Sequence, residues 1–169
     1  MCNCGKKKLP TGHQIDTGYQ TASTLSLLHE PFEYVSKLVS GDGLFLDLGA
    51  GNGQVLEIAT FYFEDMDIQG IEIDPELASQ DSRIILGNMF NFKDLIHEAK
   101  VIYMYEPFEP KYIDTMLEVV MPQTKVEKYV IFNSVSYTYK GKDEVIKKFF
   151  DPRDVRWKED IIVIKYNPI

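Results

Sequence analysis

The sequence predicts an α/β protein with a doubly wound, mainly parallel sheet. Strand-like and helix-like segments alternate along the chain, and the first buried strand runs into a glycine-rich turn followed by an amphipathic helix. The length of 169 residues falls within the usual range of about 100–200 residues for one domain. We therefore expect a disordered N-terminal tail over residues 1–16 and a single domain over residues 17–169.

The spacing of apolar residues predicts the elements in order. Leu25, Leu28 and Phe32 recur at helical spacing and predict a first helix over residues 24–39, which Pro31 could divide. Strands are expected over residues 44–48, 67–73, 83–87, 100–105, 128–134, 155–158 and 160–166. Further helices are expected over residues 54–63, 91–99, 112–120 and 142–149. The last two strands should form a terminal hairpin.

The turn after the first strand carries the strongest functional signal. Asp47 is followed by glycine at alternate positions, Gly49, Gly51 and Gly53. Such glycines let the backbone turn sharply and approach a ligand without a Cβ atom, and the next helix begins with free N–H groups. A dinucleotide-binding turn needs its third glycine at the sixth position, which is Gln54 here. The spacing therefore indicates a nucleotide cofactor but does not fit a pyrophosphate.

A second acidic residue lies beyond this turn at a suitable distance. The next apolar run reads Gly-Ile-Glu-Ile-Asp and places Glu72 about 20 residues after the turn, the spacing at which a strand-end carboxylate can accept both hydroxyls of a ribose. The alternative is an ordinary turn with a solvated Glu72. The turn and the acid together favour cofactor binding.

The pattern Asp-x-Gly-x-Gly-x-Gly, followed by Glu72, resembles the first motifs of the class I S-adenosylmethionine-dependent methyltransferases. The resemblance covers residue 44 to the end of the chain. It implies a seven-stranded, mainly parallel sheet with helices on both faces, in which the last strand is antiparallel. It also implies S-adenosyl-L-methionine as the cofactor.

The resemblance also implies which residues contact this cofactor. Asp47 is expected to reach the methionine ammonium, directly or through water, and Glu72 to bind the ribose. Asn88 matches the family position that contacts the adenine amino group, often an aspartate, and Ile73 and Met89 would flank the adenine. The full expected set is Asp47, Gly49, Ala50, Gly51, Gly53, Glu72, Ile73, Asn88 and Met89.

The segment after the fourth strand is expected to hold the methyl acceptor. In methyltransferases acting on amino groups this position often reads Asn or Asp, Pro, Pro and an aromatic, whereas this chain has Glu106, Pro107 and Phe108. The chain keeps an acceptor oxygen and an aromatic wall but loses the amide donor. We expect Glu106, Tyr105 and Phe108 to be catalytic, with Glu106 or a tyrosine assisting deprotonation of an amine. For Glu106, a helix cap or a cofactor contact is the alternative.

The expected function is therefore methyl transfer to an amine, with a protein lysine as the leading acceptor. A nucleobase or small-molecule methyltransferase and a non-catalytic S-adenosylmethionine-binding subunit are the alternatives. The net charge of −8 argues against a large nucleic-acid interface and is more compatible with a basic partner. The methyl acceptor is expected to be a protein. The sequence does not predict an oligomeric state.

Composition also bears on location and metals. No apolar run approaches the roughly 20 residues that span a bilayer, and no signal peptide is recognisable, so we expect no membrane partner and a cytoplasmic location. Cys2, Cys4 and His13 could hold zinc, but a lone Cys-x-Cys lacks the second ligand pair of a convincing site. We therefore expect no metal.

Overall fold

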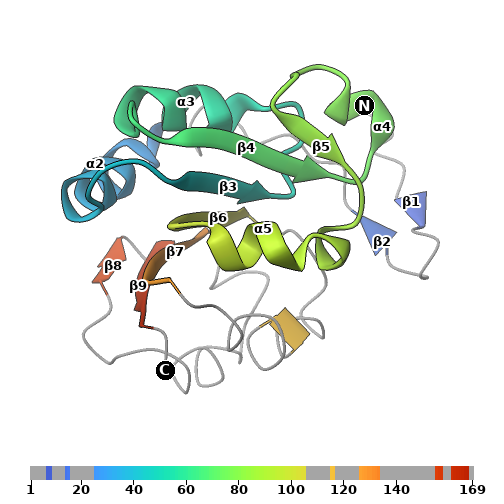
Figure 1. The fold of residues 1–169 in the computed structure, drawn as a ribbon. Coiled ribbons are helices and arrows are strands. Elements are labelled where there is room, and N and C mark those ends of the chain that lie inside the picture. The colour runs from blue at the N-terminus through green and yellow to red at the C-terminus, as the bar shows by residue number, and fades with distance from the viewer. Residues whose placement is uncertain are drawn as a thin grey trace.

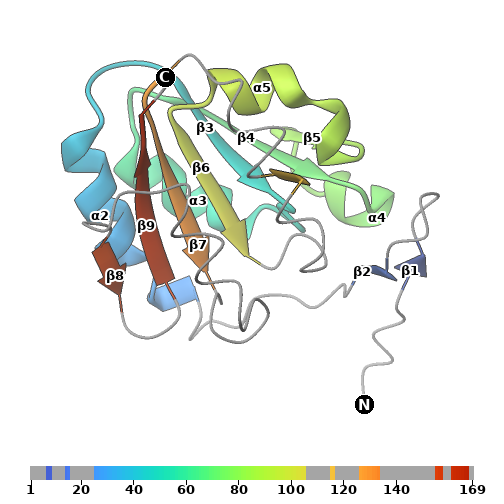
Figure 2. The same cartoon turned by 90° about the horizontal axis from the view of Figure 1, so that it is seen from below.

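The structure is a computed structural model that describes residues 7–8, 14–15, 25–105, 115–116, 126–133, 155–157 and 161–167. Seven strands form its main sheet: β3 (Leu44–Leu48), β4 (Asp67–Glu72), β5 (Ile84–Leu86), β6 (Val101–Tyr105), β7 (Lys128–Asn133), β8 (Val155–Trp157) and β9 (Ile161–Tyr166). Their order across the sheet is β5-β4-β3-β6-β7-β9-β8 (Figures 1 and 2). β5 lies at one edge of the sheet, and the short β8 lies at the other edge beside β9.

The strand directions agree with the prediction. β5, β4, β3, β6 and β7 are parallel to one another, whereas β9 is antiparallel to both β7 and β8. The mainly parallel sheet, its antiparallel last strand and the terminal hairpin are thus confirmed. The chain builds outward from β3 to β5 and then crosses back to β6, so the switch in strand order lies between β3 and β6. In such sheets ligands bind at the carboxyl ends of the strands beside this switch.

Helices cover both faces of the sheet (Figure 1). They are α2 (His29–Leu38), α3 (Gln54–Tyr62), α4 (Pro75–Ala78), the 3-10 helix η1 (Met89–Asn91) and α5 (Lys93–Glu98). Because successive strand residues face opposite sides, Phe45 packs with Phe32 under α2 and α3, whereas Leu46 packs with Ile96 of α5. The result is a three-layer arrangement with one apolar core on each side of the sheet.

The helices differ from the prediction in three places. The expected helix over residues 24–39 is interrupted: residues 25–26 are helical, residues 27–28 form a turn, and α2 begins at His29. Pro31 lies in the first turn of α2, where its missing N–H has no partner within the helix in any case. The expected helix over residues 91–99 forms as the shorter α5, and η1, separated from it at Phe92, precedes it. The short α4 was not predicted; Asp74 caps it, accepting a hydrogen bond from the Glu76 N–H at 2.9 Å, and Pro75 opens it.

Parts of the prediction fall outside this description. The expected helix over residues 142–149 lies outside the described residues, as does that over 112–120 apart from residues 115–116. Two-residue strands β1 (Lys7–Lys8) and β2 (Gln14–Ile15) pair antiparallel within residues 1–16, where we expect no order. The division into a tail and one domain stays a prediction. None of the described helices has the length and apolar character needed to cross a bilayer.

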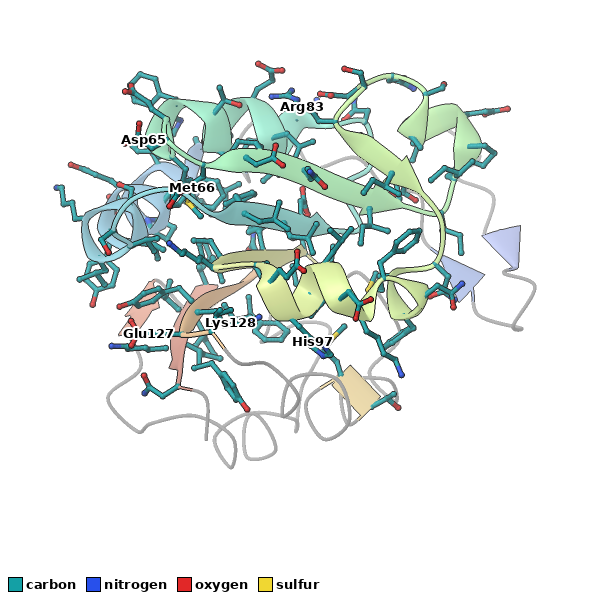
Figure 3. All side chains as sticks on the ribbon, viewed as in Figure 1. Asp65, Met66, Arg83, His97, Glu127 and Lys128 are labelled. Carbon is teal, nitrogen blue, oxygen red and sulfur yellow. The ribbon has the colours of Figure 1, made fainter. Side chains whose placement is uncertain are left out.

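A lysine buried in the sheet joins β7 to α5. Lys128 is fully buried, and its Nζ donates hydrogen bonds to the carbonyl oxygens of Ile96 and His97, the latter at 3.1 Å (Figure 3). Both carbonyls belong to the last turn of α5, where C=O groups have no partner within the helix. Burial lowers the pKa of Lys128 to about 7.

Candidate functional site

The glycine-rich turn between β3 and α3 is fixed to the neighbouring strand. The N–H groups of Gly49 and Ala50 both donate to the carbonyl oxygen of Ile71, at 2.9 and 3.0 Å. Gly49, Gly51 and Gly53 have φ angles of 87°, 57° and 89°, which favour glycine over any residue with a Cβ. The turn predicted from the glycine spacing therefore forms, and it lies at the carboxyl end of β3.

A glycine inside β4 makes room for this turn. A Cβ atom on Gly70 would lie 2.5 Å from the Cβ of Ala50, closer than two such atoms can approach. Gly70 is also the register partner of Asp47, so its missing side chain lets the turn fold back over the sheet beside that acid. We did not predict a role for Gly70, although a glycine within a strand pattern is a known sign of close backbone approach.

Glu72, the last residue of β4, binds the turn and its own strand end. One carboxylate oxygen, Oε2, accepts a hydrogen bond from the Gly51 N–H at 2.8 Å. The other, Oε1, accepts from the N–H groups of Ile73 and Asp74 at 2.8 and 2.9 Å. A carboxylate can accept about four hydrogen bonds. Three are therefore filled by backbone groups, and Oε2 keeps room for one hydroxyl in this arrangement, where we had expected Glu72 to accept two.

Asp47 is the second acid at the site and is buried. Its side chain is 1% exposed, and within the described part of the chain its Oδ1 has no hydrogen-bond partner. Burial first, and then the negative charge of Glu72, raise the pKa of Asp47 well above its ordinary value. A buried carboxylate oxygen without a partner is costly, so such a group needs either a proton or a ligand.

The segment after β5 brings the expected adenine residues to the same edge of the sheet. The Gly87 N–H donates to the Glu72 carbonyl oxygen at 2.8 Å, which places this segment beside the end of β4. Asn88 caps η1, and its Oδ1 accepts a hydrogen bond from the Phe90 N–H at 3.0 Å. Met89 is buried, whereas Ile73, at the end of β4, is half-buried and was expected with Met89 to flank the adenine. The structure thus gathers these residues, while their contacts with a ligand stay predictions.

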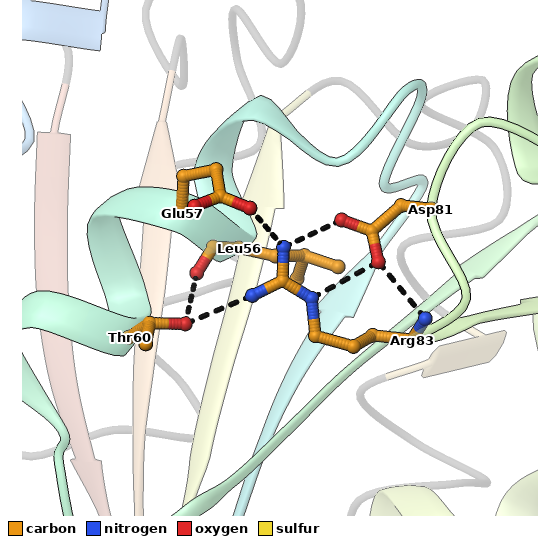
Figure 4. A network of polar contacts seen from close by, with 5 residues as sticks. All are labelled: Leu56, Glu57, Thr60, Asp81 and Arg83. Carbon is orange, nitrogen blue, oxygen red and sulfur yellow. Dashed lines mark hydrogen bonds and ion pairs between the residues drawn. The ribbon is translucent and has the colours of Figure 1, made fainter.

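A polar network supports the far end of the turn (Figure 4). Arg83 donates to the carboxylate of Asp81, with Nε at 3.0 Å from Oδ1, and reaches Glu57 and Thr60 on α3. The Asp81 carboxylate packs against Gly53, where a Cβ would lie 2.7 Å from Oδ2. Hydrogen bonding from Arg83 lowers the pKa of Asp81. The network therefore ties the start of α3 to the connection before β5, which the sequence did not predict.

The expected catalytic residues are only partly within the described chain. Tyr105 ends β6 and is half-buried, whereas Glu106 and Phe108 lie outside the described residues. The structure adds a buried polar pair nearby that we did not predict: the side-chain amide of Asn133 donates to the Tyr103 hydroxyl at 2.9 Å. Asn133 ends β7 and is the register partner of Tyr105, so this pair lies at the same edge of the sheet as the turn.

The groups at this edge fit a ligand of mixed charge. Asp47 offers an unpartnered oxygen to a cation, and Oε2 of Glu72 offers one acceptor position to a hydroxyl. Gly53 caps α3 without a side-chain acceptor, which leaves first-turn N–H groups for an anion. Among the described residues no cluster of His, Cys, Asp and Glu could hold a metal, and Cys2, Cys4 and His13 lie outside them.

The strand order, the antiparallel β9 and the glycine turn after the first strand of the sheet define the class I methyltransferase fold. No protein-family model and no curated protein matches the sequence. Solved structures do match. A putative caffeoyl-CoA O-methyltransferase from Staphylococcus aureus is 13% identical, with a TM-score of 0.66 over 89% of this chain and 86% of that one.

Two further structures match to a similar extent. An RNA methyltransferase from Salinibacter ruber, in complex with S-adenosyl-L-homocysteine, is 16% identical, with a TM-score of 0.57 over 88% of this chain and 92% of that one. A precorrin-6y C5,15-methyltransferase from Geobacter metallireducens is 13% identical, with a TM-score of 0.54 over 81% of this chain and 86% of that one. At these identities the likeness confirms the predicted fold.

Proposed function

We propose that this chain is an S-adenosyl-L-methionine-dependent methyltransferase. The observation that carries the proposal is the joint placement of Asp47, Glu72 and the glycine turn at the carboxyl edge of β3 and β4. Asp47 would hold the ammonium, Glu72 one ribose hydroxyl, and the start of α3 the carboxylate. The S-adenosyl-L-homocysteine bound by the Salinibacter ruber neighbour supports the choice of cofactor.

In this proposal the residues of the chain align the methyl acceptor with the cofactor. The cofactor, when bound, supplies a methyl carbon activated by a sulfonium. Methyl transfer from such a carbon needs an aligned acceptor with a free lone pair and exclusion of water rather than a covalent catalyst. The buried strand ends of β6 and β7, with Tyr105 and the Asn133–Tyr103 pair, would form the wall beside which the acceptor lies.

Calorimetric titration with S-adenosyl-L-methionine, S-adenosyl-L-homocysteine and NAD tests the cofactor. Binding of both adenosyl compounds without binding of NAD is the expected result, because the turn lacks the spacing for a pyrophosphate. Binding of none of the three, or of NAD alone, would overturn the proposal.

Substitution of Gly70 by alanine should weaken cofactor binding through the turn. The added methyl group would meet the Cβ of Ala50 and displace the turn that carries Gly51. We expect a loss of about 1–3 kcal/mol in binding of S-adenosyl-L-homocysteine, as for overpacking of a close contact, measured by calorimetry. Gly41→Ala is the matched control: its φ is +73° with no atom within 4 Å of the new Cβ, so it should lower stability but leave affinity unchanged. Equal affinities of both variants and the wild type would contradict the role of Gly70.

The methyl acceptor is proposed to be an amine, with protein lysine in first place. This choice rests on the motif at residues 105–108 and on the acidic charge of the chain. None of the three structural neighbours is described as acting on lysine. A small-molecule or nucleobase acceptor is the second candidate, since one neighbour is described as an RNA methyltransferase. Transfer of a labelled methyl group to protein, nucleic acid or small molecules of a lysate distinguishes them, and absence of transfer despite cofactor binding favours a non-catalytic subunit.

Substitution of Glu106 by glutamine should lower turnover and spare cofactor affinity. If the carboxylate accepts the proton of an amine, its loss removes general-base assistance, which contributes typically 10²–10⁴-fold (about two to four orders of magnitude) to a rate. Turnover and the dissociation constant of S-adenosyl-L-homocysteine are measured on the same preparation. Unchanged turnover would remove Glu106 from catalysis.

The cytoplasmic location also stays a proposal.

A further inference from the structure

Asp47 is buried on the same side of the sheet as an apolar core. It is the fourth residue of β3, and its side chain lies on the same face of the sheet as Phe45, which is fully buried under α2 and α3. The exposed fraction of Asp47 is 1%, and its Oδ1 lacks a hydrogen-bond partner in the described chain. A bare carboxylate in such a place would lose most of its hydration without compensation.

Among the described residues, the groups that face Asp47 do not supply a positive charge. Its register partners are Gly70 on β4 and Tyr103 on β6. Glu72 follows Gly70 by two residues and so lies on the same face of β4, where its negative charge opposes ionisation of Asp47. The described ion pairs join other residues, and none includes Asp47.

The backbone N–H groups of the turn do not donate a hydrogen bond to Oδ1 of Asp47 either. The N–H groups of Gly49 and Ala50, the first two residues after β3, both donate to the Ile71 carbonyl oxygen. The Gly51 N–H donates to Glu72. The carboxyl group of Asp47 is thus left with two ways to avoid a buried unpaired charge: it can bind a proton, or it can bind a cation.

We propose that Asp47 alternates between these two: it holds a proton in the absence of a cation and releases that proton when an ammonium group of the ligand lies against Oδ1. In this exchange the carboxyl O–H bond breaks, the proton passes to the solvent, and the ammonium keeps its own protons. The inference rests on the proposed function, because S-adenosyl-L-methionine and S-adenosyl-L-homocysteine carry such an ammonium beside their adenosyl part. It adds that their binding is coupled to pH through a single residue.

The coupling can be measured with two ligands. S-adenosyl-L-homocysteine carries the ammonium, whereas 5′-methylthioadenosine has the adenosyl part without it. Calorimetry at several pH values above about 4, the ordinary pKa of an aspartate, in two buffers of different ionisation enthalpy should show proton release with the first ligand and none with the second. The release with the first ligand should be largest at the lowest of these pH values. The affinity for S-adenosyl-L-homocysteine should rise with pH, by up to about tenfold per unit while Asp47 is protonated, and that for 5′-methylthioadenosine should stay constant.

The variant Asp47→Asn supplies a readout that needs no ligand. Because the folded protein holds this proton more tightly than the unfolded chain, the folded-to-unfolded ratio of the wild type should fall relative to the variant as the pH rises above about 4, by up to tenfold per unit. Urea denaturation of both proteins at several pH values measures this. Asp42→Asn, at an exposed position before β3, is the matched control and should follow the wild type. Asp47→Asn should also abolish the proton release and weaken the binding of S-adenosyl-L-homocysteine more than tenfold.

The outcomes separate this inference from the proposed function. Binding of S-adenosyl-L-homocysteine without proton release, or equal pH dependence of stability in the wild type and Asp47→Asn, would overturn the proton exchange and leave the methyltransferase proposal intact. Failure of both ligands to bind would overturn the proposed function and the cation half of the inference together. Proton release that persists in Asp47→Asn would assign the coupling to another group and overturn it as well.

Discussion

Replacement of Glu72 by glutamine should weaken binding of S-adenosyl-L-homocysteine at least about a hundredfold and destabilise the protein. The carboxylate accepts three backbone N–H groups, from Gly51, Ile73 and Asp74. A side-chain amide has one oxygen, and its NH₂ group would face an N–H that needs an acceptor. Losing one charge-assisted hydrogen bond and leaving one donor unpaired costs roughly 3 kcal/mol, about a hundredfold in affinity if the turn must be restored on binding.

Calorimetry and thermal denaturation measure the two effects of Glu72→Gln. Glu76→Gln removes the same charge from an exposed position on α4, close in sequence, and should change neither quantity appreciably. A Glu72→Gln protein of unchanged melting temperature would mean that the carboxylate does not hold the turn. Normal affinity with lowered stability would restrict Glu72 to a structural role.

Replacement of Lys128 by methionine should change how stability depends on pH. The pKa of Lys128 is lowered by burial to about 7, below the ordinary value of 10.5 in the unfolded chain. Between these two values the unfolded chain binds more protons than the folded protein, so this residue makes the wild type more stable as the pH rises. The gain is about 1.4 kcal/mol per pH unit. The variant lacks this gain and also leaves the carbonyls of Ile96 and His97 without their donor.

Urea denaturation of both proteins at intervals from about pH 6 to pH 9, spanning the lowered pKa, measures the free energy of unfolding. Relative to that of Lys128→Met, the free energy of unfolding of the wild type should rise by up to about 3 kcal/mol across the two pH units above pH 7. Lys37→Met removes an exposed lysine from α2 and should give a curve parallel to that of the wild type. A Lys128→Met curve that is also parallel would show that the buried amine does not titrate in this range.

Local patterns predicted most of the sheet and the position of the turn. The spacing of Gly49, Gly51 and Gly53 and the acid at Glu72 depend on short stretches of sequence, and the structure brings them together at one edge. Pro31 was harder to interpret, because a proline is tolerated in the first turn of a helix, and the predicted start of this helix lay several residues earlier.

Contacts between distant segments were not predictable from such patterns. Gly70 matters because Ala50 folds over it, which requires the register of β3 and β4. Lys128 begins a strand of apolar residues, and only the position of α5 across the sheet explains its burial. The three hydrogen bonds that the Glu72 carboxylate accepts from backbone N–H groups likewise depend on the shape of the turn. The spacing that identified Glu72 in the sequence does not predict them.

The antiparallel β9 has a consequence for folding of the protein. β9 lies between β7 and β8 in the sheet, although both of these strands precede it in the sequence. All six residues of β7 are buried in the complete sheet. Until β9 pairs with it during folding, β7 has an open edge of unpaired N–H and C=O groups beside apolar side chains, a template for pairing with other chains. A folding intermediate in which β9 has not yet paired is therefore exposed to aggregation at this edge, and a chaperone that covers an open strand edge would act at that stage.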